Sequence, residues 1–246
     1  MRGHTIALSP SRRVQNDFLF VANRTPIVPM DRCMALAALV EARRACRHRP
    51  PWTALFLKGY ALLAQEFPEL RRVHISLPWP HLYEYPSTVA MVAFERKSGG
   101  EAEVFAGSIK NPASRSLPEL VEILRRFNEA PLAEIKEVRR VRMLGRLPWP
   151  LRRSLMWLGL NIGRQRANFF GTFALSVYSA LGAESLRPLA PCPVVLNYGV
   201  IAPDGSVIVR FIYDHRVMDG ATVARALQTF ETILTETIAG ELAAWQ

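Results

Sequence analysis

A histidine followed four residues later by an aspartate and a glycine is the part of the sequence best suited to chemistry. His215 opens this pattern, Asp219 and Gly220 complete it, and Asp214 and Arg216 extend it to Asp-His-Arg-x-x-Asp-Gly. A histidine held at the end of a strand keeps a fixed ring orientation, and imidazole titrates close to working pH, as a general base must. The glycine permits a tight backbone before a helix. The pattern favours a catalytic base over the alternative, a structural turn with an incidental histidine.

The elements around this histidine are a strand before it and a helix after it. Residues 206–213 form an apolar, β-branched run that predicts a strand, and residues 221–239 place apolar side chains along one helical face. Other expected helices are 31–48, capped by Asp31, then 53–66 and 117–129. A hairpin is expected between 88–96 and 102–108, turning at 97–100. Helices and strands mixed without strict alternation predict an α+β fold, with residues 1–246 as a single domain.

Three segments together resemble a known family. The stretch 214–221, Asp-His-Arg-Val-Met-Asp-Gly-Ala, is similar to the active-site motif of the dihydrolipoyl acyltransferases of 2-oxo acid dehydrogenase complexes. Residues 171–176 (Gly-Thr-Phe-Ala-Leu-Ser) and 67–70 (Phe-Pro-Glu-Leu), the latter after Lys58, resemble two further family segments in the same order. The resemblance implies a chloramphenicol acetyltransferase-like two-layer fold, in which a mixed sheet packs with helices. A stand-alone, divergent member without a lipoyl domain is expected.

The resemblance also implies roles for individual residues. His215 matches the base that takes a proton from a thiol, and Ser176 matches the serine that donates a hydrogen bond to the tetrahedral oxyanion. Asp219 matches the aspartate that holds the histidine loop, in relatives often through an arginine, for which Arg12 and Arg13 are the candidates. Family members form homotrimers whose active site takes histidine from one chain and serine from its neighbour.

The charge of the chain points to an anionic partner. The 31 basic and 21 acidic residues leave a net charge of +10, and residues 139–166 hold eight arginines and no acidic residue. This segment would suit a phosphorylated donor, an acidic acyl carrier protein or a membrane surface, unless the arginines only reflect codon usage. Within it, residues 151–163 could form an amphipathic helix, either ordinary packing or a membrane or acyl-chain contact. Nucleic acid is not expected, because no recognition motif accompanies the charge.

The remaining composition limits the cofactors and the compartment. Three widely spaced cysteines, Cys33, Cys46 and Cys192, form no metal-ligand pattern and favour a reducing cytoplasm, with membrane association left open. His4, His48, His74 and His81 also lack metal-ligand spacing, so we expect no metal site and no covalently bound cofactor.

The sequence thus predicts a stand-alone acyltransferase. It would move an acyl group from a thioester donor, acyl-CoA or an acyl carrier protein, to a thiol, hydroxyl or amine through a tetrahedral intermediate. The alternative is a non-catalytic trimeric scaffold or binding subunit derived from the same fold.

Overall fold

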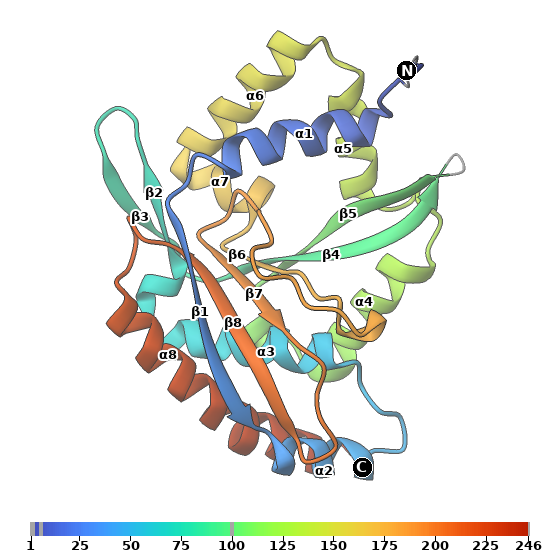
Figure 1. The fold of residues 1–246 in the computed structure, drawn as a ribbon, viewed down its shortest axis with the longest axis vertical. Helices are drawn as coiled ribbons and strands as arrows, with labels where there is room; N and C mark the ends of the chain where they lie inside the picture. Colours follow the sequence, from blue (N-terminus) through green and yellow to red (C-terminus); the bar gives the residue numbers. More distant parts are fainter. Residues whose placement is uncertain (1–2, 5–6, 99–100, 246) are drawn as a thin grey trace.

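Two sheets form the framework of the computed structural model, which describes residues 3–4, 7–98 and 101–245. The large sheet is mixed, with strand order β1-β8-β7-β6-β4-β5, and a small antiparallel pair, β2-β3, lies beside it (Figure 1). The strands are β1 (Ile27–Ala35), β2 (Arg72–Ile75), β3 (His81–Glu84), β4 (Val89–Ser98), β5 (Glu101–Lys110), β6 (Phe173–Leu175), β7 (Val194–Tyr198) and β8 (Ser206–Asp214). The α+β prediction is confirmed.

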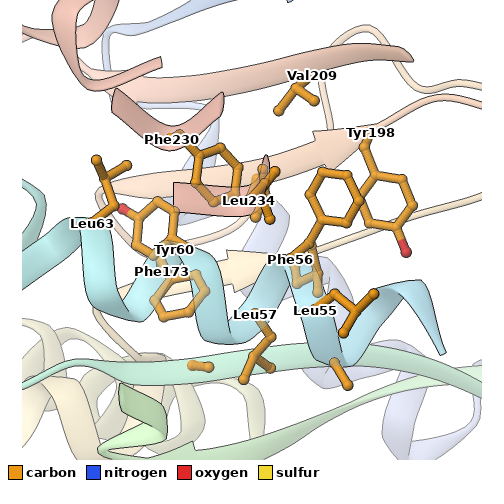
Figure 2. Packing of buried hydrophobic residues seen from close by; sticks show 14 of the residues in the cluster. Leu55, Phe56, Leu57, Tyr60, Leu63, Phe173, Tyr198, Val209, Phe230 and Leu234 are labelled. Atoms are coloured by element: carbon orange, nitrogen blue, oxygen red, sulfur yellow. The ribbon is translucent and has the colours of Figure 1, made fainter. Parts of the chain in front are cut away.

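One face of the large sheet is covered by helices. They are α2 (Ala37–Ala45), α3 (Trp52–Glu66), α4 (Leu117–Glu129) and α8 (Gly220–Thr232), which a π-helical turn (Ile233–Ile238) joins to α9 (Ala239–Ala243). Figure 2 shows α3 against the sheet: the Tyr60 ring stacks on Phe173, and Phe56 stacks on Tyr198, each pair with centroids 4.0 Å apart. This layer of helices holds the central strands, and therefore the residues at their ends, in fixed positions.

A second group of helices lies at the other end of the molecule (Figure 1). It consists of α1 (Pro10–Ala22), α5 (Lys136–Arg146), α6 (Trp149–Asn161) and α7 (Gly163–Phe170). Val14, Met156, Leu160 and Phe170 form its own small apolar core. Short 3₁₀ turns connect other elements at Pro68–Arg71, Pro112–Ser114 and Ser179–Leu181.

Most of the predicted elements are present. The helices expected over 53–66 and 117–129 are α3 and α4, and α4 begins with a capping box between Ser116 and Glu119. The strand expected over 206–213 is β8, and the helix over 221–239 is α8 with its π-helical continuation. The hairpin is β4–β5, paired as far as Ser98 and Glu101, whereas residues 99–100 of its turn lie outside the described residues.

The helix predicted over 31–48 is wrong in its first part. Residues up to Ala35 belong to β1, and the helix α2 begins only at Ala37. Asp31 does not cap it, because its carboxylate accepts two hydrogen bonds from Arg210 on β8, at 2.5 and 2.6 Å. Pairing with β8 along the whole strand outweighs the local helical preference of the segment, an interaction that periodicity along one chain does not reveal.

Candidate active site

His215 lies in the turn that follows β8 and precedes α8. Its backbone N–H donates to the carbonyl oxygen of Pro26 at 3.0 Å, and Val217 N–H closes the turn onto Asp214 O at 3.0 Å. The imidazole is about half exposed, with 49% of its side chain accessible, and lies 5.8 Å from the Tyr213 ring. The histidine therefore combines a fixed backbone with a ring that a substrate can reach.

Asp214 and Arg216 hold the two sides of this turn together. The Asp214 carboxylate, only 2% exposed, accepts from Arg216 Nε at 2.9 Å, Arg216 Nη2 at 2.7 Å and the Arg216 backbone N–H at 3.0 Å. A forked, charge-assisted contact of this kind has strict geometry. Both residues belong to the sequence pattern, but their mutual contact, which spans His215, was not expected from the sequence.

The Asp219 side chain makes no hydrogen bond to His215 among the described residues. Its side chain is 86% exposed, and its Oδ1 lies 3.8 Å from His215 Nδ1, beyond hydrogen-bond distance. Asp219 provides the extended residue from which α8 begins, and its carbonyl accepts from Thr222 N–H at 3.1 Å.

Neither Arg12 nor Arg13 pairs with Asp219 among the described residues. Arg12 donates to Gln15 Oε1 at 3.4 Å, and Arg13 donates to the Leu8 carbonyl at 3.1 Å. Both contacts stay within the N-terminal segment, where α1 packs on α5, so a role of either arginine in holding the histidine loop stays a prediction.

Ser176 directly follows β6, and its backbone is fixed on both sides. Its N–H donates to Leu196 O at 3.2 Å, and its carbonyl accepts from the buried Asn197 side chain at 2.5 Å. Among the described residues its hydroxyl has no hydrogen-bond partner, and the side chain is partly exposed. The hydroxyl is therefore available to a ligand, as an oxyanion donor requires.

The sheet register places Ser176 and His215 far apart within one chain. Leu175 on β6, Leu196 on β7 and Phe211 on β8 are aligned across the sheet. Ser176 lies one residue beyond this row, and His215 lies four residues beyond it in the opposite direction, because β8 runs antiparallel to β6 and β7. Five residues of strand correspond to about 16 Å. A single chain does not bring the serine and the histidine to one carbonyl group.

The guanidinium of Arg166 lies near the Asp214–Arg216 contact. Arg166 donates to the carbonyls of His74 at 2.7 Å and Pro191 at 3.3 Å, and burial lowers the pKa of its guanidinium. Burial, and then the charge of Arg216, lower the pKa of His74. Burial raises the pKa of the Cys192 thiol to about 12. His74 was expected to be a surface or satisfied core residue, and nothing in the sequence indicated that it lies near Asp214 and Arg216.

The third segment of the resemblance, Lys58 with residues 67–70, has a structural role. The Lys58 ammonium is buried, donates to the Arg115 carbonyl and lies 3.4 Å from Glu241, so it ties α3 to the C-terminal helix. Arg71, directly after Phe-Pro-Glu-Leu, donates to the carbonyls of Ala64 and Tyr85 at 2.7 and 2.8 Å. These residues stabilise the helical layer and take no part in the candidate site.

The arginines of 139–166 do not form one uniform patch. Arg152 and Arg153 both bind the buried carboxylate of Asp17, an acid that the sequence places far away on α1. Arg166 is engaged with carbonyls, and Arg142 donates to Ser98 Oγ at 2.8 Å. The exposed ones are Arg139, Arg140, Arg146 and Arg164.

The described residues form neither a cluster of metal ligands nor a helix able to span a membrane. Residues 3–4, 7–98 and 101–245 contain no group of three or more His, Cys, Asp or Glu side chains arranged to hold a metal ion. Within the same ranges, no helix has both the length and the apolar character needed to cross a bilayer.

The six-stranded mixed sheet with its helical layer is the chloramphenicol acetyltransferase-like fold, as predicted. No family model and no curated protein sequence matches the chain. Among solved structures, it is similar to the dihydrolipoamide acetyltransferase of Azotobacter vinelandii, with a TM-score of 0.70, 17% identity, and 97% of this chain and 93% of that chain covered.

Two further solved structures share the fold. The cubic core of a pyruvate dehydrogenase multienzyme complex matches with a TM-score of 0.64 and 15% identity, covering 97% of this chain and 93% of that one. A chloramphenicol acetyltransferase matches with a TM-score of 0.53 and 15% identity, covering 90% and 94%. The chain therefore has the fold of the acyltransferase family that its motifs resemble.

Proposed function

We propose that this protein is an acyltransferase that moves an acyl group from a thioester donor, acyl-CoA or an acyl carrier protein, to a thiol, hydroxyl or amine. The observation that carries the proposal is the exposed His215 imidazole on a turn braced by the Asp214–Arg216 contact. It stands at the end of β8 in a fold shared with acetyltransferases. We propose that all 246 residues serve as one catalytic domain without a bound cofactor, and that the protein acts in the cytoplasm.

The chemistry needs one base and one oxyanion donor. His215 takes the proton from the acceptor S–H, O–H or N–H, and the acceptor atom attacks the thioester carbonyl carbon. The carbonyl π electrons move to oxygen, and the Ser176 hydroxyl donates a hydrogen bond to that oxyanion. When the intermediate collapses, the C–S bond breaks, and the leaving thiolate takes the proton back from the imidazolium.

We propose that the Ser176 and the His215 of one site come from different copies, because about 16 Å of strand separates them within one chain. In the Azotobacter vinelandii enzyme a serine, a histidine and an asparagine have been studied for their role in catalysis, and the last two are four positions apart, like His215 and Asp219. The chain after Ser176 exposes large apolar side chains at Leu181 and Leu186, 82% and 72% accessible. We propose that a neighbouring subunit of a homotrimer covers this region and completes the site.

Thiol release from acetyl-CoA and from longer acyl-CoA donors, followed with a disulfide reagent, tests the activity. His215→Ala should reduce turnover by about 10²–10⁴-fold, because it removes the only proposed base. Ser176→Ala should reduce it by about 10²-fold through loss of one oxyanion donor. Both side chains are at least partly exposed, so the variants should melt like the wild type. Wild-type turnover in His215→Ala would instead favour the non-catalytic scaffold.

Mixing the two inactive variants tests the shared site. If each site takes its histidine and serine from different chains, His215→Ala and Ser176→Ala subunits that exchange should regain part of the activity. The control is the same mixture without exchange, prepared below the subunit dissociation temperature. A monomer that is fully active when dilute would refute the shared site.

The exposed arginines of α5 are proposed to steer the anionic donor. Arg139 and Arg140 are exposed, and Arg142 makes one hydrogen bond to Ser98. Replacing all three with alanine should raise the KM for the donor and flatten its salt dependence, while kcat changes little, since steering precedes chemistry. An unchanged KM at low salt would show that these charges do not meet the donor.

A further inference from the structure

Helix α6 is apolar on the side that faces away from the protein as well as on the side that faces it. Its inner side buries Met156 and Leu160, which pack with Val14 and Phe170. Its outer side carries large apolar residues that are 43–56% exposed: Leu151, Leu155, Trp157, Leu158 and Ile162. A surface helix normally presents polar residues to water, and one that is apolar all round is normally covered on both sides.

These outer residues form one continuous strip. Leu151, Leu155, Leu158 and Ile162 follow one another at intervals of four, three and four residues, which places them in a row along a helix. Trp157 lies next to this row, with 56% of its surface exposed. We call these five residues the outer face of α6.

The outer face is held rigidly in place. On the inner side of α6, Arg152 and Arg153 both bind the Asp17 carboxylate of α1, which is 3% exposed. The Arg153 guanidinium also lies over the rings of Phe20 and Trp149, at 4.0 and 4.9 Å from their centroids. These contacts fix how α6 is rotated on α1, so the apolar strip cannot turn inward.

Positive charge lies at both ends of the outer face. Arg146 precedes α6 at the end of α5, Arg164 follows it at the start of α7, and both are exposed. Residues 139–166 contain no acidic residue to neutralise them, and Asp17 is already engaged by two arginines. The outer face of α6 is therefore an apolar strip with a cationic rim, which Arg146 and Arg164 form at its two ends.

Another exposed tryptophan lies in the β2–β3 pair, which packs on α7, the helix that follows α6. The turn between β2 and β3 exposes Trp79 to 67%, and this strand pair is fixed to the start of α7 because Tyr85 Oη donates to Gly163 O at 2.7 Å. Trp79 and Trp149 occupy equivalent places in the two Leu-Pro-Trp-Pro segments, 77–80 and 147–150. Tryptophan is enriched at the interface between lipid and water.

We propose that the outer face of α6 docks on an anionic lipid bilayer, with the helix lying in the plane of the headgroups. The 13 residues of α6 are too few to span a bilayer, but the combination of an apolar strip and basic ends fits its surface. A second copy of the chain fits less well, because a symmetric contact would bring the arginines of the two rims close together. An acidic carrier protein would pair with the arginines of the rim, but it would offer no apolar surface to the strip.

Co-sedimentation with vesicles tests the proposal independently of acyl transfer. The wild type should sediment with phosphatidylcholine vesicles containing one third phosphatidylglycerol and much less with pure phosphatidylcholine, and added salt should weaken the binding. Leu155→Glu and Trp157→Glu should each lower the partition coefficient at least about tenfold. Leu155→Gln repeats the test without adding a charge. Ile208→Glu, at an apolar residue of β8 that is 42% exposed, close to the 45% of Leu155, is the matched control and should bind like the wild type.

Arg146→Ala with Arg164→Ala should remove the preference for the anionic vesicles. The proposal is overturned if the wild type does not sediment with anionic vesicles at low salt, or if Ile208→Glu loses binding as much as Leu155→Glu. It is also overturned if neither the wild type nor any variant binds vesicles and light scattering shows an oligomer that Leu155→Glu dissociates. The outer face would then be a contact between copies of the chain. Because thiol release in solution does not enter these measurements, failure of the proposed acyl transfer would leave the result unaffected.

Discussion

The Asp214 carboxylate is expected to control both the stability of the fold and the position of His215, the proposed base. It is 2% exposed and accepts three hydrogen bonds from Arg216, whereas Arg216 itself is 35% exposed. Breaking a fully buried ion pair costs about 3–5 kcal/mol. Because solvent reaches Arg216, we expect a smaller cost than this, about 2–3 kcal/mol, for Asp214→Ala. In a chain of this length each kcal/mol lowers Tm by about 2–4 °C, so Tm should fall by about 4–12 °C.

The same change should lower kcat more than it alters KM. Asp214 and Arg216 flank His215, so without their contact the turn is held by backbone hydrogen bonds alone, such as those of His215 N–H to Pro26 O and Val217 N–H to Asp214 O. A displacement of a catalytic group by about 1 Å can cost about 10²-fold in rate. The donor should still bind, since neither residue belongs to the arginine segment. Arg216→Lys should give an intermediate kcat, because a lysine keeps the charge but not the forked geometry.

A double-mutant cycle separates this contact from a general loss of packing. Asp214→Asn and Arg216→Gln should each destabilise the protein, and the double variant should be about 1–2 kcal/mol less destabilised than the sum of the two. Denaturant unfolding gives the free energies, and thiol release at a temperature where all variants are folded gives kcat and KM. Additive free energies, or a Tm and kcat of wild-type size in Asp214→Ala, would refute the reasoning.

Three further outcomes follow from buried groups. Under native conditions at mildly alkaline pH, a disulfide reagent should label the exposed Cys33 rapidly. Cys192 should react only on unfolding, because burial raises the pKa of its thiol to about 12, and fast labelling of Cys192 would contradict its burial. The pKa of His74 lies below its ordinary value, so the unfolded chain binds more protons than the folded one and stability should fall as the pH drops below about 6.5. His74→Gln should reduce this fall in Tm, and an unchanged pH profile would exclude His74 as its source. Gly171→Ala should destabilise by about 2–4 kcal/mol in urea unfolding, because φ is +75° and a Cβ would lie 2.5 Å from Met91 Cγ; a neutral effect would show that β4 can move.

The parts of the fold that were predicted correctly depend on short stretches of sequence. Apolar side chains at helical spacing located α4, and the apolar, β-branched run before the motif located β8. The Asp-His-Arg-x-x-Asp-Gly pattern located the histidine at a strand-to-helix turn, where the structure has it. In each case the information lies within about a dozen neighbouring residues.

The failures share a different cause, which is pairing over long sequence distances. The sequence around Asp31 predicts a helix cap, because nothing nearby suggests its partner, Arg210, which lies 179 residues away. The arginine segment looked uncompensated because the Asp17 that neutralises Arg152 lies 135 residues away. Neither partner has a local pattern, so composition and periodicity could not have revealed them.

The separation of Ser176 from His215 has a consequence for what this chain can do alone. Strand order and direction, β6 parallel to β7 and β7 antiparallel to β8, fix the two residues at opposite ends of the sheet. No side-chain rotation covers the distance of about 16 Å, and a shift of β8 that closed it would expose the apolar residues that pack against α3 and α8. If Ser176 serves as the oxyanion donor, it can therefore reach the carbonyl group at His215 only from another copy of the chain. On the proposed mechanism an isolated subunit would keep its base but lose the donor, so acyl transfer is expected to depend on assembly of the proposed homotrimer.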